Sequence, residues 1–544
     1  MAIKSILLMF LASTLCLGFL NCSSSADSTG NPGTNSPLGS PTYVDTGSGQ
    51  LQGSTNGLVT SFKGIPYAKA PIGNLRWKAP QPVDSWTGTR NAQQFAAHCA
   101  QSALTSSAFE GSEDCLYLNV WTRSTDSTRH RPVIVFLHGG GNTTGSGDID
   151  YTRFISQFDA VVISLNYRLG PFGFLAHPLL ASEDPHGSTG NYAIMDQIYA
   201  LRWIQKNISA FGGDPQRVVL SGQSAGSHNA SVLLTSPQAA NLFQGAILMS
   251  ETWFVQPPAT VDNTTKVAVR FLGCDAAADV IGCLRNSSTS QVASVPGAGG
   301  ANAGWDPSCA DINLGCRFHL ASVDGFILPQ TPQQLARSGL QNKIPVLIGT
   351  TSAEWSTIAA VFGSSIQTDA DYLNDLKRTF TLSKANSIYQ LYPSSAYESP
   401  LVADIIAVGD VFHQCATQAL LNDLSLNQAQ PIWQYVWAHT WERGPNHNLG
   451  PGHGTDLPFH FLTYGENELS VTEKDLAKKM AQAIYNFALN GTPEGGNFTW
   501  PAFTKAQPEF KVWETVTSMG AAWRQQECTK LKNAGFDWEF FPTR

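Results

Sequence analysis

The chain has 544 residues, of which 42% are hydrophobic and 14% are charged, so it is long enough to bury a large core. Its formal net charge is −8 and it has no basic stripe to neutralise phosphates, which argues against nucleic acid as a partner. Ten cysteines in a chain of this length do not make a disulfide-dense scaffold.

The N-terminal residues are typical of an export signal. Lys4 precedes a mostly apolar run at residues 6–20. At about 15 residues, this run is shorter than the ~20 that a membrane span needs. Cys22 and the serines after it resemble a bacterial lipoprotein signal, in which the cysteine is lipidated, although Asn21 replaces the usual small residue. The alternative is ordinary cleavage after Ala26.

Three regions follow from this pattern. We expect a signal peptide of the lipoprotein type at residues 1–22, in preference to plain secretion. A flexible tether is expected at residues 23–40, which are rich in Ser, Gly, Asn and Pro. Residues 41–544 are expected to form a single folded domain.

Short apolar runs alternate with helical periods along that domain. Five runs are predicted to be buried strands, at residues 133–137, 160–165, 217–220, 244–249 and 344–348. Helices are predicted at residues 191–211 and 473–490, and loops at the Ser-, Gly- and Ala-rich residues 285–310. Alternating strands and helices predict an α/β fold with a mostly parallel sheet covered on both faces.

A nucleophile motif follows the strand at 217–220. Residues 222–226 read Gly-Gln-Ser-Ala-Gly and precede a segment that is compatible with a helix through Leu234. This is the setting of a nucleophile elbow, where a tight turn projects a serine hydroxyl above the sheet. We therefore predict Ser224 to be the nucleophile.

A serine nucleophile also needs donors for the oxyanion. Residues 138–141 read His-Gly-Gly-Gly and directly follow the strand at 133–137, where glycines let backbone amides approach a substrate oxygen. We predict the amides of Gly140, Gly141 and Ala225 to be the donors. His138 itself is expected to be structural.

The base and the acid should come later in the chain, in the order acid and then histidine. The histidines well beyond the elbow are at 319, 413, 439, 447, 453 and 460. Only His453 lies in a tight glycine setting, which suits an imidazole on an exposed loop. Glu354, shortly after the strand at 344–348, is the best candidate acid, and Asp324 and Asp410 remain rivals from spacing alone.

With these residues in place, the sequence resembles the type B carboxylesterase and cholinesterase family, including its bacterial carboxylesterases. The likeness covers nearly all the chain after residue 41 and rests on the segments at 112–120, 165–174, 190–226 and 452–456. The resemblance implies the α/β-hydrolase fold, a mostly parallel central sheet flanked by helices, and ester hydrolysis through an acyl-enzyme intermediate. It places the triad on Ser224, Glu354 and His453, and it implies no cofactor and no metal.

The resemblance also bears on the cysteines. It implies disulfides between Cys99 and Cys115 and between Cys274 and Cys283, and it leaves open a third between the cysteines at 415 and 528. The cysteines at 309 and 316 are left over, and a local pair between them is our own inference. Two residues depart from the family pattern, Gln223 where Glu is usual and Trp355 where Gly is usual.

The substrate is only partly indicated. Residues 100–114 form a short loop without tryptophan, and this argues against a dedicated choline site, because cation recognition uses an aromatic face. We expect a small, soluble or short-chain ester, with Trp253, Phe254 and Phe318 as candidate walls of the acyl pocket. Alternatives are another acyl bond, such as an amide or lactone, and a non-catalytic adhesion protein of the same fold. The oligomeric state stays open.

Overall fold

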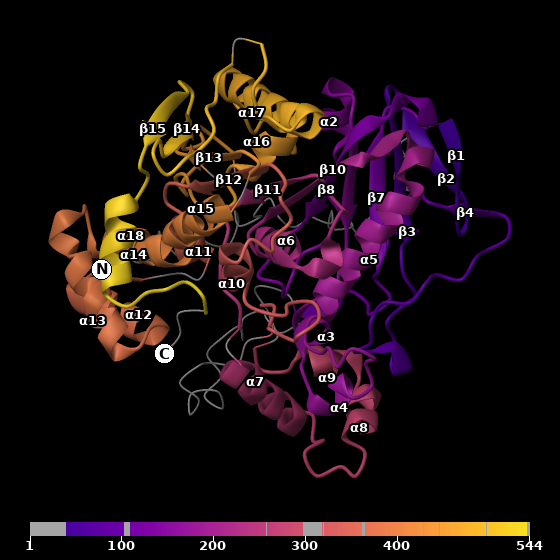
Figure 1. The fold of residues 1–544 in the computed structure, drawn as a ribbon, viewed down its shortest axis with the longest axis horizontal. Coiled ribbons are helices and arrows are strands. Elements are labelled where there is room, and N and C mark those ends of the chain that lie inside the picture. The colour runs from indigo at the N-terminus through magenta and orange to yellow at the C-terminus, as the bar shows by residue number, and fades with distance from the viewer. Residues whose placement is uncertain are drawn as a thin grey trace, which may run out of the picture.

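The computed structural model describes residues 40–102, 109–256, 258–297, 318, 320–361, 365–427, 429–444, 447–496 and 498–540. Within these ranges one 13-stranded sheet runs through the molecule in the order β1-β2-β3-β7-β9-β8-β10-β11-β12-β13-β14-β15, with β4 paired to β2 (Figure 1). Its strands are β1 (Ser40–Thr46), β2 (Gly49–Asn56), β3 (Val59–Pro66), β4 (Thr89–Asn91), β7 (Tyr117–Thr122), β8 (Arg131–Leu137), β9 (Val161–Leu165), β10 (Gly213–Gln223), β11 (Gly245–Met249), β12 (Val346–Thr351), β13 (Ile432–Trp437), β14 (Glu509–Trp513) and β15 (Ser518–Ala521). A separate hairpin pairs β5 (Gln101–Ser102) with β6 (Phe109–Glu110).

The centre of the sheet is parallel, and toward both edges the pairings are antiparallel apart from the parallel pair of β2 and β4. Every pairing from β9 through β8, β10, β11, β12 and β13 to β14 is parallel. All residues of β8, β9 and β11 are buried, which explains their continuous apolar sequence. Because parallel strands end at the same edge, the loops that follow β8, β10, β12 and β13 lie at one end of the sheet.

Helices cover both faces of this sheet. On one face, α5 (Tyr192–Asn207) and α6 (Ala225–Thr235) pack into the larger hydrophobic cluster. On the other face, α2 (Thr152–Gln157), α16 (Leu457–Phe461) and α17 (Val471–Asn490) pack into the second cluster, as Figure 1 shows. The molecule therefore has three layers, with the sheet in the middle and one hydrophobic cluster between each face of the sheet and the helices that cover it.

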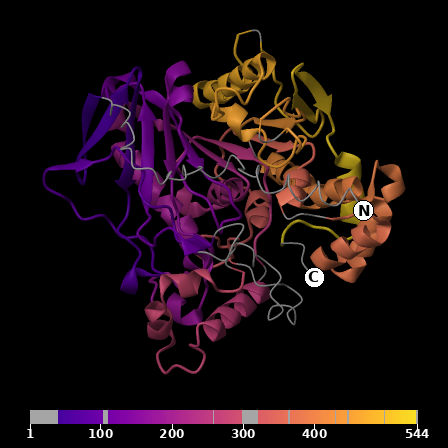
Figure 2. The same cartoon turned by 180° about the vertical axis from the view of Figure 1, so that it is seen from behind.

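The remaining helices lie mostly beyond the carboxyl ends of the strands or at the side of the molecule. Helices α12–α14 and α18 gather at one side in both views (Figure 2). The bounds are α3 (Gly170–Phe174), α4 (Pro178–Ala181), α7 (Pro258–Phe271), α8 (Val280–Asn286), α9 (Thr289–Ala293), α10 (Pro332–Arg337), α11 (Trp355–Val361), α12 (Asp369–Thr379), α13 (Leu382–Leu391), α14 (Pro400–Gly409), α15 (Cys415–Asn427) and α18 (Gln525–Asn533). A π-helical turn at Asp410–Gln414 joins α14 to α15.

The predicted strands and helices are confirmed, with shifted bounds. The helix expected at residues 191–211 ends as α5 at Asn207 and continues as a 3₁₀ turn to Phe211. The expected loop at 285–310 is wrong at residues 285 and 286, which end α8, and at Thr289–Ala293, which form α9. For α9 the reason is a capping box, in which Ser288 and Gln291 satisfy each other's backbone amides and stabilise a short helix. Residues 298–310 lie outside the described ranges.

Three disulfides join described residues. Cys99 pairs with Cys115 and Cys274 with Cys283, as the family resemblance implied. The third bond joins Cys415 at the start of α15 to Cys528 in α18, two residues that are 113 positions apart in the chain. It fastens α18, the last helix that the structure describes, to α15. The cysteines at 16, 22, 309 and 316 lie outside the described residues.

Among the helices that the structure describes, none combines the length and the hydropathy required to cross a bilayer.

Candidate active site

Ser224 lies in a tight turn between β10 and α6. Its φ is +56° and its ψ is −125°, a backbone conformation that L-residues rarely adopt and that costs free energy. A Cβ on Gly222 would lie 2.2 Å from the carbonyl oxygen of Gly226, and one on Gly226 would lie 2.1 Å from that of Leu137. Both flanking positions therefore require glycine, and the turn is a nucleophile elbow.

Glu354 and His453 meet beside this elbow. Nδ1 of His453 lies 2.6 Å from Oε2 of Glu354, while the amide of Thr351 donates to Oε1 at 2.7 Å. Glu354 is fully buried, and burial alone would raise its pKa, but His413, His453 and the Thr351 amide lower the pKa overall. The carboxylate is therefore held ionised against the imidazole.

The second ring nitrogen of His453 faces the elbow. Its Nε2 lies 3.2 Å from the side-chain nitrogen of Gln223, the residue before Ser224. The His453 side chain is 12% exposed, so solvent or substrate can reach the ring, whereas Glu354 behind it is sealed. The order from the interior outward is therefore carboxylate, imidazole and elbow.

The two rival acids are engaged elsewhere. Asp324 accepts the backbone amides of residues 326–328 in a turn and the hydroxyl of Ser188. Asp410 accepts the hydroxyl of Tyr392 at 2.9 Å and pairs with Arg524 at 3.2 Å. The structure brings Glu354, and neither rival, to His453.

Most of the other histidines are also accounted for. His439 bonds Glu473 at 3.0 Å, His447 is exposed and bonds its own turn, and burial lowers the pKa of His460 to about 3. His138 stacks on Tyr167 with ring centroids 4.3 Å apart, and burial lowers its pKa to about 4. The histidine at 319 lies outside the described residues.

His413 lies beside the predicted base, although nothing in the sequence marks it as part of the site. It lies in the π-helical turn after α14, and its ring centroid is 4.8 Å from that of His453. Burial lowers its pKa to about 4, so it is neutral at physiological pH. Ligand-type atoms of Glu354, His413 and His453 lie within 4.8 Å of one another, but the first and last of these residues already bond each other.

The glycine loop after β8 lies against the elbow. A Cβ on Gly139 would come within 3.1 Å of the Cβ of Ser224, and one on Gly140 within 2.3 Å of a backbone oxygen. Gly140 and Gly141 have φ of +102° and +63°, values that favour glycine. The close approach of the elbow therefore requires glycine at 139, crowding by Thr144 of the same loop requires it at 140, and the positive φ favours it at 141.

The same loop has backbone amides free for a ligand. The carbonyl of Gly140 accepts the amides of Thr143 and Thr144 at 3.1 and 3.0 Å. In a trans peptide the following N–H points the opposite way, so the Gly141 amide points away from that turn. Within the described chain, no acceptor is bonded to the amides of Gly140, Gly141 or Ala225.

A second carboxyl group lies behind the elbow. Glu251, just after β11, is fully buried and accepts the hydroxyls of Ser227 at 2.7 Å and Ser231 at 2.9 Å, both on α6. Burial raises its pKa to about 8, so it is protonated at neutral pH. The sequence carries no motif that marks this residue.

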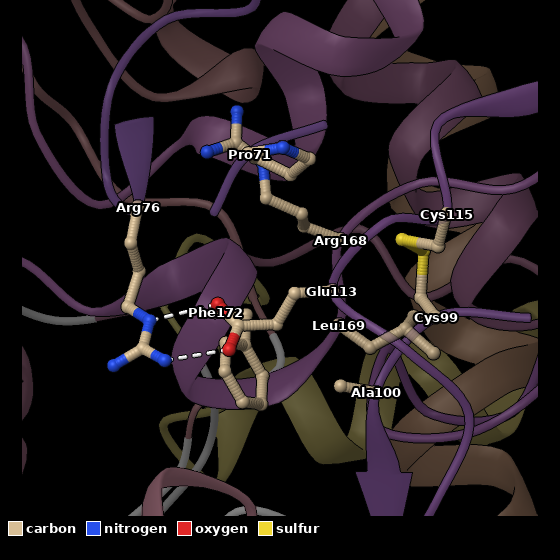
Figure 3. A pocket seen from close by; sticks show the side chains of 9 residues that line it. All are labelled: Pro71, Arg76, Cys99, Ala100, Glu113, Cys115, Arg168, Leu169 and Phe172. Atoms are coloured by element: carbon tan, nitrogen blue, oxygen red, sulfur yellow. Dashed lines mark hydrogen bonds and ion pairs between the residues drawn. A yellow bond between two sulfur atoms is a disulfide. The ribbon is translucent and has the colours of Figure 1, made fainter. Parts of the chain in front are cut away.

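A further buried ion pair supports the loop between Cys99 and Cys115. Figure 3 shows Arg76 joined to Glu113 by two bonds, with Nε–Oε2 and Nη2–Oε1 distances of 2.7 and 2.5 Å. Arg76 also donates to the carbonyl of Ser287 just after α8. The pocket drawn there is lined by no residue of the predicted triad, and its charged side chains are already in ion pairs. We therefore assign the Arg76–Glu113 pair to support of the loop and not to a reaction site.

The candidate acyl-pocket residues are buried aromatic side chains. Trp253, Phe254 and Phe318 are each 1% exposed and belong to the larger core cluster. Phe254 contacts Phe412, on which Trp355 stacks with centroids 5.6 Å apart. This aromatic cluster therefore extends from the segment after β11 to the helix that begins beside Glu354.

These features define a class of protein. A mixed, mostly parallel sheet with helices on both faces, and an elbow serine at the carboxyl end of a central strand, are the marks of an α/β-hydrolase. The chain matches the model of the carboxylesterase family over residues 40–531, and it belongs to that family.

Individual relatives agree with the assignment to the carboxylesterase family. The chain is 31% identical to fumonisin B1 esterase of Sphingopyxis macrogoltabida, with 85% of this chain and 84% of that protein covered. It is 31% identical to para-nitrobenzyl esterase of Bacillus subtilis, with 87% and 94% covered. A solved structure of a PNB esterase superposes with a TM-score of 0.76 at 28% identity, covering 90% of this chain and 99% of that one. The protein is therefore a carboxylic ester hydrolase.

Proposed function

We propose that this protein hydrolyses small carboxylic esters through an acyl-enzyme intermediate formed on Ser224, with His453 as general base and Glu354 as the acid of the triad. One observation carries the proposal: His453 is bonded through Nδ1 to the buried carboxylate of Glu354 and turns Nε2 toward the elbow. This is the arrangement in which an imidazole can take a proton from a serine.

The first half of the reaction forms the acyl-enzyme. Nε2 of His453 removes the proton from Oγ of Ser224 as that oxygen attacks the ester carbonyl. The carbonyl oxygen becomes an oxyanion, for which we propose the amides of Gly140, Gly141 and Ala225 as donors. The tetrahedral intermediate then collapses, the bond to the alcohol oxygen breaks, and the imidazolium gives its proton to the leaving alcohol.

The second half regenerates the enzyme. A water molecule attacks the acyl carbon while His453 takes its proton, and the oxyanion forms at the same donors. Collapse releases the carboxylic acid and returns the proton to Ser224. Glu354 stays ionised throughout, because its task is to hold the tautomer of His453 and to stabilise the imidazolium.

The surroundings favour an uncharged leaving group. Gln223 places a neutral carboxamide 3.2 Å from the base, and Glu251 behind the elbow is protonated at neutral pH. Neither supplies an anion that would attract a cationic alcohol. The names of the relatives, para-nitrobenzyl esterase and fumonisin B1 esterase, support small-molecule esters as the substrate class.

We also propose that the chain is exported and anchored through a lipidated Cys22. Residues 23–39 would be the tether and residues 40–544 one hydrolase domain, since β1 already begins at Ser40. The three disulfides support export, because such bonds persist in oxidising compartments. The apolar run and the polar segment around Cys22 support the anchor.

Covalent capture tests the nucleophile. A fluorophosphonate should label Ser224, and Ser224→Ala should lose both labelling and turnover on an ester panel that varies the acyl and alcohol parts separately. Ser221→Ala is the matched control. It removes a buried hydroxyl near the end of β10, just before Ser224, and this hydroxyl has no hydrogen-bond partner in the described chain. A label on another residue, or an active Ser224→Ala, would refute the assignment.

A further inference from the structure

Two buried asparagines join the glycine loop to the helix that follows the nucleophile. Nδ2 of Asn142 donates to Oδ1 of Asn229 at 3.0 Å, and Nδ2 of Asn229 donates back to Oδ1 of Asn142 at 2.8 Å. Both residues are 0% exposed and they are 87 positions apart in the chain. A reciprocal pair of this kind satisfies one donor and one acceptor on each side chain and fixes their separation.

The pair closes one end of a loop whose other end is also held. Before the glycines, the hydroxyl of Tyr167 donates to the carbonyl of His138 at 2.6 Å. After them, Asn142 follows Gly141 directly, and its carbonyl accepts the amide of Gly170 at 2.7 Å. Three consecutive glycines have little conformational preference of their own, so the position of the loop depends on its anchors. These two contacts act together with the bonds that the carbonyls of Gly139 and Gly140 accept within the loop.

Asn142 is suited to this place by its backbone as well. Its φ is +56°, in the left-handed region that asparagine tolerates better than most residues. The chain can therefore turn out of the glycines and still direct a carboxamide into the interior. Asn229, one turn into α6, receives that carboxamide from a helix that is itself packed against β8, β10 and β11.

The helix α6 also carries the third oxyanion donor. Its first residue is Ala225, whose amide follows Ser224 directly, so the Asn142–Asn229 pair links the loop donors to the same rigid element as the nucleophile. We propose that Asn142 and Asn229 are positioning residues that set the distance between the loop amides and Ser224. This inference rests on the proposed function, and it assigns the pair no contact with substrate.

The pair should act on the transition state and leave substrate binding almost unchanged. The oxyanion exists only after attack, so a displaced donor loop weakens stabilisation of the tetrahedral intermediate while the ester still binds. Loss of one donor typically costs 10²- to 10³-fold in kcat, and a loosened donor should cost less. We expect Asn229→Ala and Asn142→Gly each to lower kcat roughly 10- to 100-fold, with KM within about twofold.

The two single variants and the double variant form a cycle. Asn142→Gly removes the carboxamide but keeps the positive φ, so backbone strain does not contribute. Because both substitutions break the same pair, the double variant should lose little more than either single variant. A trifluoromethyl ketone, which adds to the serine and places an oxyanion in the same donors, should lose affinity in proportion to kcat.

Asn207→Ala is the matched control. Asn207, at the end of α5, is also buried and also makes two side-chain bonds, to the backbone of Trp203 and Gly47. Since α5 runs antiparallel to the strands, its end lies at the edge of the sheet opposite the elbow. We expect Asn207→Ala to lower the melting temperature with unchanged kcat and inhibitor affinity. If Asn229→Ala behaved in the same way, the pair would be merely structural and the inference would be wrong.

Where Asn229→Ala folds poorly, Asn229→Asp keeps one of the two bonds and should give an intermediate kcat. An unchanged kcat in folded Asn229→Asp and Asn142→Gly would also overturn the inference. Ser224→Ala, measured alongside, distinguishes a failure of the proposed function from a failure of the positioning role. Activity that persists in Ser224→Ala refutes the proposed function, whereas full activity in the asparagine variants with an inactive Ser224→Ala refutes only the positioning role.

Discussion

Glu354 touches His453 twice. Its carboxylate lies 2.6 Å from Nδ1 of the ring, and its backbone carbonyl accepts the amide of His453 at 3.1 Å. The second bond holds the loop of the histidine against the start of α11, so the ring and its partner move together. The carboxylate is fully buried, which strengthens its interaction with an imidazolium.

Replacement of this carboxylate should affect turnover far more than folding. Glu354→Gln should lower kcat about 10³- to 10⁴-fold, because an amide holds the wrong tautomer of the histidine. Glu354→Asp keeps the charge and should lose much less. Steady-state kinetics with thermal melting of each variant check this, and Asp324→Asn is the control. Near-normal turnover in folded Glu354→Gln would exclude this acid.

Substitution of Gln223 tests how the electrostatic field at His453 affects turnover. Gln223→Glu would place a carboxylate where the amide now lies 3.2 Å from Nε2 of His453. A nearby anion favours the protonated imidazole, which cannot accept the serine proton. The fall of kcat/KM on acidification should therefore begin at a higher pH than in the wild type, by roughly one unit. The same variant should improve kcat/KM for a cationic ester relative to its neutral isostere, and identical profiles would argue against this contact.

Glu251 makes stability depend on pH in a defined direction. Burial raises the pKa of Glu251 to about 8 from 4.5, so between these values the folded protein keeps a proton that the unfolded chain releases. The unfolded state binds fewer protons, and this group therefore lowers stability as pH rises through that window, by up to about 1.4 kcal/mol per pH unit.

Glu251→Gln removes this dependence while a carboxamide can still bond both serine hydroxyls. We expect the melting temperature of the variant, relative to wild type, to rise from pH 4.5 to pH 8 and then to level off. Melting curves across that range measure the difference. A difference that is constant with pH would show that Glu251 titrates normally.

The Arg76–Glu113 pair should matter for stability. Both side chains are less than 10% exposed, so Glu113→Gln leaves a buried guanidinium without its counter-charge. Loss of one partner of such a pair typically costs about 3–5 kcal/mol in the free energy of unfolding. Asp262→Asn, in the exposed pair with Lys266, should change it by less than about 1 kcal/mol. Denaturant unfolding compares the two, and equal effects would contradict the buried role.

The lipid anchor can be tested without the folded domain being altered. In a bacterial host, the wild-type protein should partition into detergent, and Cys22→Ala should move it to the aqueous phase with unchanged kcat. An acyl chain adds roughly 0.8 kcal/mol of membrane affinity per buried methylene, so the shift should be nearly complete for a multiply acylated cysteine. Mature protein that begins near Asp27 would indicate plain secretion instead.

Local pattern was enough to predict some of these features. Ser224 was predicted as the nucleophile from a buried strand, a turn with glycines at 222 and 226, and a following helix. This was possible because the constraint on each of these residues comes from its immediate neighbours. The glycine loop after β8 and the central strands were predicted for the same reason. Spacing alone made Glu354 the best candidate acid but left Asp324 and Asp410 as rivals, and the family resemblance was needed to choose among them.

Tertiary structure decided the rest. Glu354 and His453 are 99 residues apart and meet only because β12 and β13 are parallel neighbours that end at one edge of the sheet. His413, Glu251 and the Asn142–Asn229 pair lie in no motif, and their roles depend on contacts between separate elements. A side chain's burial and its partners come from how strands and helices pack, and neither is encoded in the residues beside it.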